Sequence, residues 1–153
     1  MKVVLLSSGA MAPKRVNDYA AGYDLFTPKD SVVSPGRNLI PLDISIELDP
    51  RTEGEVRPCS GFSINGMKGY SLEDLNTEKR FDADVILGTV DEDFRGGVGV
   101  IIKSHEDKPF IIKQGVKIAQ LVVKSYIGKS LEIVSELSKT ERGARGFGEL
   151  EHQ

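Results

Sequence analysis

Residues 39–48, LIPLDISIEL, decide the fold class. Within them Asp43, Ser45 and Glu47 alternate with apolar residues at every second position from Leu42 to Leu48. Successive side chains of a β-strand point to opposite faces of a sheet, so this alternation predicts a strand with one wet and one buried face. The chain is therefore expected to cover its core with β-sheet.

Similar runs, short and rich in β-branched residues, recur between turn signals such as Ser34-Pro35-Gly36 and Asp49-Pro50. The expected strands are Val3–Leu6, Ser31–Val33, Leu39–Leu48, Val85–Val90, Val98–Lys103, Phe110–Lys113, Ile118–Tyr126 and Leu131–Val134. Many short strands and few helical patterns predict an all-β sandwich or barrel. At most one short helix is expected, within Ser71–Lys79, where Ser71 is the cap and Asp74 stands third after it.

A length of 153 residues fits a single domain. The residues from Arg142 onward are rich in glycine and then polar, so they are expected to form an arm outside the core. The predicted organisation is a β-barrel domain over residues 1–141 and a flexible C-terminal arm over residues 142–153.

Composition narrows the function classes. No apolar run approaches the roughly 20 residues that cross a bilayer, and Val3–Leu6 is too short for a signal peptide. A net charge of -3 with both signs interspersed argues against nucleic acid or a membrane as partner, so any phosphate site has to be local. One cysteine, Cys59, and two histidines exclude an internal disulfide and a zinc set. A soluble intracellular protein of the cytoplasm or nucleus is expected.

Two segments contain residue types suited to a nucleotide. Residues 142–148, RGARGFG, combine glycines with two guanidiniums that fork onto phosphate oxygens, and Phe147 is a ring that stacks on a base. A disordered end is the alternative. Residues 91–97, DEDFRGG, place Phe94 beside an acidic cluster, where a sugar can pack on the ring while a carboxylate activates a water molecule. A charged hairpin turn is the alternative there.

Three further segments carry little information alone. Asp24 in residues 20–25 fits a surface strand, and Ser60-Gly61 in residues 57–61 fits an ordinary turn. Gln120 is the only polar side chain in Ile118–Val123, which also fits a glutamine that satisfies core hydrogen bonds.

In their order along the chain, these five segments resemble the motifs of the trimeric dUTP pyrophosphatase (dUTPase) family. The matching sequences, across residues 20–148, are Ala-Gly-Tyr-Asp-Leu, Pro-x-Ser-Gly, Gly-Thr-Val-Asp-Glu-Asp-Phe-Arg-Gly, Gly-x-Lys-Ile-Ala-Gln-Leu and Arg-Gly-x-x-Gly-Phe-Gly. The resemblance implies a jelly-roll-like β-barrel of the β-clip type and a homotrimer with shared active sites. It also implies Mg²⁺-dependent hydrolysis of dUTP to dUMP and pyrophosphate, which limits uracil in DNA and supplies dUMP for thymidylate synthesis.

The same resemblance assigns residue roles. Asp91 matches the carboxylate that orients and deprotonates the attacking water, and Asp24 reaches the metal through water while Mg²⁺ otherwise sits on the substrate phosphates. The implied substrate-binding residues are Ser60, Gly61, Gly88, Phe94, Gly99, Gln120, Arg142, Phe147 and Gly148. The strands around residues 91–100 are expected to form a hairpin whose backbone reads the uracil edge. Phe147 is expected to stack on uracil as the arm closes.

The chain departs from the family pattern where phosphate is expected. Cys59 stands where the second motif normally has an arginine, and Arg57, expected on the same strand face, is the candidate substitute. Glu149 and Leu150 replace hydroxyl residues after the fifth motif. An insertion around residues 66–82 is expected to be a lid, a trimer contact or a surface for a protein partner.

Two other functions remain as alternatives. A nucleotide-binding regulator that has lost catalytic rate is motivated by Cys59 and Glu149. A dCTP deaminase relative on the same fold is disfavoured, because Asp91 and Phe147 follow the hydrolase pattern.

Overall fold

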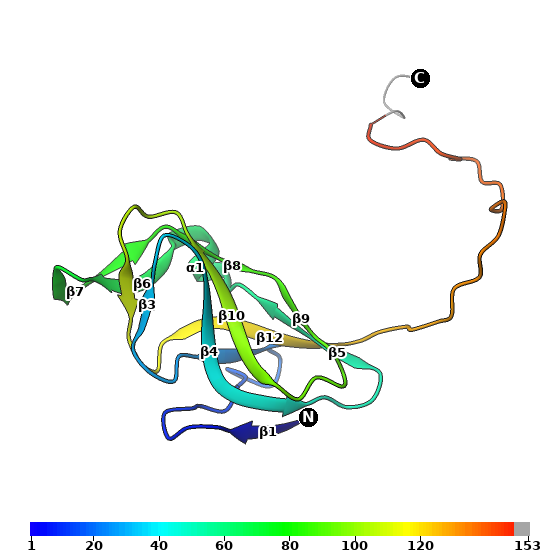
Figure 1. The fold of residues 1–153 in the computed structure, drawn as a ribbon. Helices are drawn as coiled ribbons and strands as arrows, with labels where there is room; N and C mark the ends of the chain where they lie inside the picture. Colours follow the sequence, from blue (N-terminus) through cyan, green and yellow to red (C-terminus); the bar gives the residue numbers. More distant parts are fainter. Residues whose placement is uncertain (149–153) are drawn as a thin grey trace.

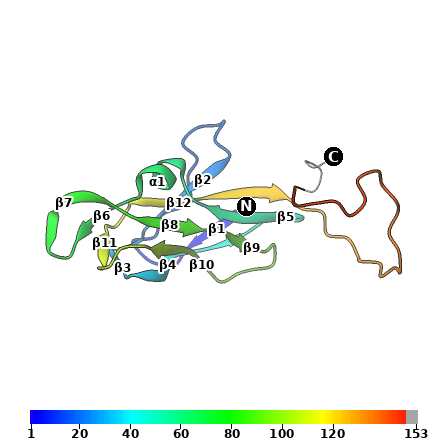
Figure 2. The same cartoon turned by 90° about the horizontal axis from the view of Figure 1, so that it is seen from above.

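The computed structural model describes residues 1–148 as an all-β barrel-like body with one extended arm (Figures 1 and 2). The elements are β1 (Lys2–Leu5), β2 (Gly22–Phe26), β3 (Ser31–Val33), β4 (Gly36–Glu47), β5 (Thr52–Arg57), α1 (Ser60–Asn65), β6 (Met67–Ser71), β7 (Asp74–Phe81), β8 (Ala83–Ile86), β9 (Gly88–Val90), β10 (Gly97–Ser104), β11 (Phe110–Ile112) and β12 (Lys117–Ser125). The predicted fold class, all-β with one short helix at most, is confirmed for the described residues.

Three antiparallel sheets of four strands build the body. Sheet A has the order β1-β4-β10-β8, sheet B has the order β2-β12-β5-β9, and sheet C has the order β3-β11-β6-β7. The long strand β4 pairs with β10 through its first half and again at Ser45, and its second half also pairs with β1 on the other edge. Asp43 has a φ of 54° just before the residues that pair with β1.

The apolar side chains of all three sheets meet in one core. Leu42, Ile44 and Ile46 are buried on one face of β4, as the alternation in residues 39–48 predicted. In sheet C the ring of Phe110 stacks on Phe81 with 4.4 Å between the ring centroids. Burial of this continuous apolar set is the main stabilising contribution to the fold.

The position predicted for the helix is wrong. Residues 71–79 form the turn of a β-hairpin and most of β7, while the helix α1 lies earlier, at Ser60–Asn65. Ser71 Oγ accepts a hydrogen bond from the Glu73 N–H at 3.1 Å, and Asp74 Oδ1 accepts one from the Asn76 N–H at 3.0 Å. The side chains that suggested a helix cap therefore stabilise a tight turn between paired strands.

Two strand predictions also need correction. The run Val85–Val90 divides into β8 and β9, and these strands belong to sheets A and B. β8 and β10 pair antiparallel in sheet A, with Ile86 opposite Ile101, so the strands on either side of residues 87–96 form the expected hairpin. Its long connection contains β9, which pairs with β5 in sheet B. The strand predicted at Leu131–Val134 is absent from the described chain, since no neighbouring strand pairs with this segment.

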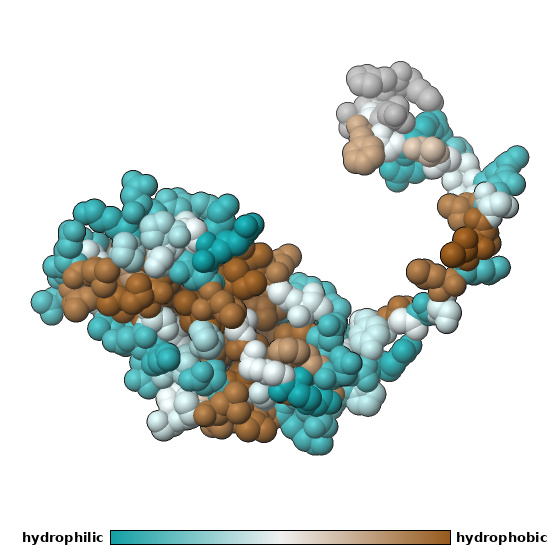
Figure 3. Space-filling model, viewed as in Figure 1, coloured by the Kyte–Doolittle hydropathy of each residue, from teal (hydrophilic) through white to brown (hydrophobic). Residues whose placement is uncertain are grey.

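The extended arm begins where β12 ends. β12 stops at Ser125, well before the boundary at residue 141 that the glycines suggested, and the chain then runs away from the barrel (Figure 1). Apolar side chains line the arm (Figure 3), and Leu131 and Ile133 are 96% and 99% exposed. Glu149 and Leu150 lie outside the described residues.

Within residues 1–148, the single helix is far too short and too polar to cross a membrane.

Candidate functional site

Sheet B brings together the polar residues of the first and fourth motifs. Gln120 on β12 is paired with Asp24 on β2 and, across its other edge, with Arg57 on β5. The Gln120 Nε2 donates a hydrogen bond to the Pro58 carbonyl oxygen at 3.0 Å. A Cβ at Gly22 would overlap Gln120 Oε1, so the glycine of the first motif makes room for the glutamine of the fourth.

The second motif enters the same place through the short helix α1. Cys59 is its N-cap, and the Cys59 carbonyl oxygen accepts hydrogen bonds from the Phe62 and Ser63 N–H groups, each at 3.0 Å. Ser60 and Gly61 are the first helical residues and are exposed, and nothing lies within 4 Å of a Cβ placed on Gly61. Burial raises the pKa of the half-buried Cys59 thiol, so it is uncharged at neutral pH.

Arg57 and Cys59 lie on different elements. β5 ends at Arg57, so Cys59 is not on the same strand, and the Arg57 guanidinium forms an ion pair with Glu55 on its own strand. Glu55 is also held by Lys124 Nζ at 2.8 Å. The expectation that Arg57 and Cys59 share one face is therefore wrong.

Lys117 is the cation that reaches this group, and sequence reasoning missed it. Its Nζ lies 3.4 Å from Asp24 Oδ2, and its positive charge is near enough to oppose the rise in the Cys59 pKa. The available signal was its place three residues before Gln120 in the fourth motif. Asp24, Lys117, Gln120 and residues 58–61 together form what we call the phosphate cluster.

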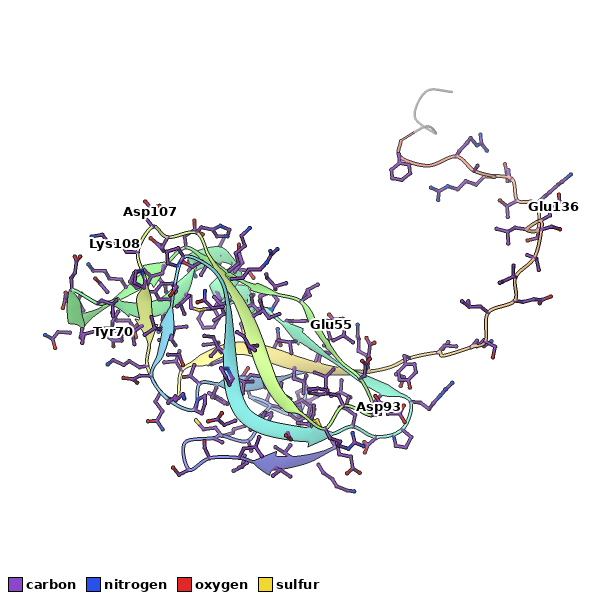
Figure 4. The ribbon with its side chains drawn as sticks, in the orientation of Figure 1. Glu55, Tyr70, Asp93, Asp107, Lys108 and Glu136 are labelled. Carbon is purple, nitrogen blue, oxygen red and sulfur yellow. The ribbon has the colours of Figure 1, made fainter. Side chains whose placement is uncertain are left out.

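The third motif lies elsewhere, beside a cavity of about 490 Å³ lined by Glu53, Asp91, Glu92, Asp93 and Tyr126. Asp91 follows directly after β9, and its carbonyl oxygen accepts a hydrogen bond from the Phe94 N–H at 3.1 Å. The Phe94 ring packs on Gly96, where a Cβ would lie 2.7 Å from Phe94 Cζ. Figure 4 shows Asp93 near the end of the barrel from which the arm leaves.

The backbone near Gly99 has an irregular pairing. The register between β10 and β4 shifts between Gly97 and Gly99, and the residue opposite Gly99 is Pro41, which has no N–H to donate. A Cβ at Gly99 would lie 2.6 Å from Leu39 Cδ1. Gly88 begins β9 opposite Val56.

The phosphate cluster and Asp91 are far apart in one chain. Gln120 pairs with Arg57, whereas Asp91 follows Val90, which pairs with Gly54 at the other end of β5. Asp91 is therefore level with Glu53, four residues along β5 from Arg57, and at the rise of a strand this separates Asp91 from Gln120 by roughly 13 Å along the strands. Arg142 and Phe147 are farther away still, exposed on the arm.

Among residues 1–148, no three or more histidine, cysteine, aspartate and glutamate side chains are grouped so that they could hold a metal ion. The neighbouring Asp24 carboxylate and Gln120 amide are hard oxygen donors, of the kind that suits Mg²⁺ bound largely through water and substrate.

Comparison with known proteins decides the family. The model of the dUTPase family matches residues 9–72 and 77–150. The chain belongs to the dUTPase family. The deoxyuridine 5'-triphosphate nucleotidohydrolase of Clostridium tetani is 38% identical over 97% of this chain and 94% of its own length, and that of Gloeothece citriformis is 39% identical with the same coverage.

Solved dUTPase structures have the same fold. A dUTPase mutant of Staphylococcus bacteriophage 80alpha with dUpNHpp has a TM-score of 0.81 and 25% sequence identity, over 97% of this chain and 96% of that one. Between its two matched segments the dUTPase family model leaves residues 73–76 unmatched, and these are the end of the β6–β7 turn and the start of β7.

Proposed function

We propose that this member of the dUTPase family hydrolyses dUTP to dUMP and pyrophosphate. The observation that carries the proposal is Asp91, which opens on a cavity of about 490 Å³ in a chain whose full-length relatives are deoxyuridine triphosphate nucleotidohydrolases. The Asp91 carboxylate accepts a proton from a water whose oxygen attacks the α-phosphorus. The bond from the α-phosphorus to the bridging oxygen breaks, and pyrophosphate leaves with the electron pair.

The phosphate cluster is the proposed site of the triphosphate. Ser60 and Gly61 contact the phosphate chain, and Lys117 supplies the positive charge that Cys59 lacks. Asp24 and Gln120 would hold a substrate-bound Mg²⁺ through its waters, and that ion would neutralise charge on the phosphate oxygens. Lys117 Nζ lies 3.4 Å from Asp24 Oδ2, so its positive charge is available at the same place.

The base and sugar are proposed to bind near the third motif. Phe94 offers its ring to the deoxyribose, and the irregular backbone around Gly99 and Gly88 offers peptide groups to the uracil edge. Pro41 supports this assignment, because a residue without an N–H leaves the opposite strand with fewer ladder hydrogen bonds. Phe147 and Gly148 cover the base from the arm, and Arg142 binds the outer phosphates.

We propose a homotrimer with shared sites, which the separation of Asp91 from the phosphate cluster in one chain supports. In-line attack needs the water, Asp91 and the phosphates within a few ångströms, whereas in one chain Asp91 is roughly 13 Å along the strands from Gln120 of the phosphate cluster. The sixteen residues that follow Tyr126, up to Arg142, reach roughly 50 Å when extended, enough to cross onto another subunit. The exposed Leu131 and Ile133 are apolar contacts available for that crossing.

The hairpin β6–β7 is proposed as a surface for a protein partner. β7 is an edge strand of sheet C with a largely exposed surface, and Leu72 and Leu75 near its turn are about half exposed. An edge strand offers unpaired backbone groups to another chain. A free thiol and a nucleotide substrate favour an intracellular location.

The direct test is pyrophosphate release from dUTP with Mg²⁺, with dCTP, dTTP and UTP as controls. We expect fast release from dUTP alone that Asp91→Asn and EDTA each abolish. Tight dUTP binding without release would instead identify a nucleotide-binding regulator. Uracil nucleotide and ammonia from dCTP would identify a deaminase.

A further inference from the structure

Glu92 connects the loop that contains Asp91 with the root of the arm, by which we mean its first residues, from Tyr126 to Gly128. Glu92 Oε2 accepts a hydrogen bond from the Tyr126 hydroxyl at 2.5 Å and another from the Arg51 N–H at 2.9 Å. Hydrogen bonds to an ionised carboxylate are among the stronger ones in proteins. The bond from Tyr126 holds the pKa of Glu92 below its ordinary value of 4.5, so the carboxylate is charged at neutral pH.

Arg51 fixes the arm side of this junction. Its φ is 64°, so it occupies a turn conformation that few non-glycine residues adopt. Its carbonyl oxygen accepts a hydrogen bond from the Tyr126 N–H at 3.1 Å, and its guanidinium carbon lies 5.5 Å from the Tyr126 ring centroid. Its Nη2 donates to the Gly128 carbonyl oxygen at 3.4 Å. The first residues of the arm are thus held against the start of β5.

Arg95 fixes the loop side. Its Nη1 donates to the Glu92 carbonyl oxygen at 2.8 Å and to the Phe94 carbonyl oxygen at 3.1 Å. The loop also closes on itself through the Phe94 N–H and the Asp91 carbonyl oxygen. The loop from Asp91 to Arg95 is therefore closed by its own hydrogen bonds, and Glu92 is its side-chain anchor to the barrel and the arm.

We propose that Glu92 and Tyr126 are positioning residues for the reaction: their hydrogen bond, completed by Arg51, sets Asp91 and the root of the arm in one arrangement. The inference rests on the proposed function, since it assigns Asp91 to the attacking water and Arg142 and Phe147 to the closing arm. Glu92 and Tyr126 line the same cavity as Asp91, and their proposed role is to hold Asp91 in place. By holding Asp91 in place they affect the rate, because misplacement of a catalytic group by about 1 Å slows a reaction up to about 100-fold.

The test compares Tyr126→Phe, Glu92→Gln and Glu92→Ala with the wild type. Tyr126→Phe keeps the ring under Arg51 and removes only the hydroxyl donor, so kcat for dUTP is expected to fall about tenfold while KM changes by less than about threefold. Glu92→Gln keeps an oxygen for both donors and is expected to lose less. The double variant of Tyr126→Phe and Glu92→Ala is expected to be no slower than Glu92→Ala alone, because both remove the same bond.

A second readout follows the arm. In the wild type, dUpNHpp is expected to protect the arm from trypsin, and Tyr126→Phe is expected to weaken that protection at the same nucleotide occupancy. Tyr70→Phe is the matched control, because Tyr70 lies on the β6–β7 hairpin at the opposite end of the molecule from Asp93 (Figure 4). Thermal midpoints of all variants separate lost positioning from lost folding.

Three outcomes are distinguishable. Slower turnover by folded Tyr126→Phe, with Tyr70→Phe unchanged, supports the inference. Turnover and arm protection within about twofold of the wild type in both Tyr126→Phe and Glu92→Gln overturn the inference and leave the proposed function intact. A wild type that does not release pyrophosphate from dUTP overturns the proposed function and the inference with it.

Discussion

Lys117→Ala is expected to weaken dUTP binding more than it slows the chemical step. The Lys117 Nζ lies 3.4 Å from Asp24 Oδ2 and faces the second motif, where Cys59 provides no charge. A contact to a phosphate away from the reacting phosphorus is made both in the bound substrate and in the transition state. Its loss therefore raises KM and leaves kcat nearly unchanged.

The magnitude follows from the exposure of the side chain. A hydrogen bond to a charged group contributes about 1.5–3 kcal/mol, and the 45% exposure of the Lys117 side chain reduces this to about 1–2 kcal/mol. That free energy corresponds to a KM about 5–30 times higher. Cys59→Arg restores a guanidinium at the family position, so adding it to Lys117→Ala is expected to recover most of the loss.

The assay is pyrophosphate release over a range of dUTP concentrations at fixed Mg²⁺ and salt. Lys113→Ala is the matched control, because Lys113 Nζ also pairs with an aspartate, Asp30, at 3.2 Å and its side chain is 38% exposed. The reasoning would be refuted if Lys117→Ala left KM within about twofold, or if Lys113→Ala raised it equally.

Three other expectations follow from the packing and charges. Phe110→Ala should lower the free energy of unfolding by about 3–5 kcal/mol in urea titrations, because Phe110 is fully buried and stacked on Phe81; a loss below about 1 kcal/mol would contradict the core described above. The folded-state pKa of Glu92 is lowered, so the stability that its charge contributes is present above pH 4.5 and is lost as the pH falls through the folded pKa. In a plot of the urea midpoint against pH, Glu92→Gln should therefore reduce the fall at acid pH, and a plot identical to that of the wild type would contradict this. Replacing Leu131 and Ile133 by aspartate should shift sedimentation from the proposed trimer to smaller species, because both side chains are exposed in one chain; an unchanged sedimentation coefficient would exclude them from an interface between subunits.

The sequence predicted the fold class because β-strands have a strong local signal. The alternation around Ile44 and Ile46 was sufficient to place β4 and to identify its buried face. The helix was misplaced because a serine followed by an acidic residue, as at Ser71 and Asp74, suits a helix cap and a hairpin turn equally well. Pairing of β6 with β7 decides between them, and that pairing is not visible in a local pattern.

The candidate site was predicted less completely. Residues of the five motifs could be named, but the contact of Asp24 with Gln120 and Lys117 depends on the register of β2 against β12. The same limit explains the error at Arg57, whose ion pair with Glu55 is a property of β5. Leu131–Val134 has the composition of a strand, yet a strand forms only beside a partner, and one chain provides none for this segment among its described residues.

The most direct test of a shared site is complementation between two inactive variants, Asp91→Asn and Asp24→Asn, unfolded together and refolded as a mixture. If Asp91 of one subunit serves the phosphate cluster of another, random mixing in a cyclic trimer leaves about one site in four with both carboxylates. We therefore expect about a quarter of the wild-type rate of dUTP hydrolysis from the mixture and almost none from either variant alone. A mixture as inactive as its components, beside wild-type chain that regains activity by the same procedure, would contradict a site shared between subunits.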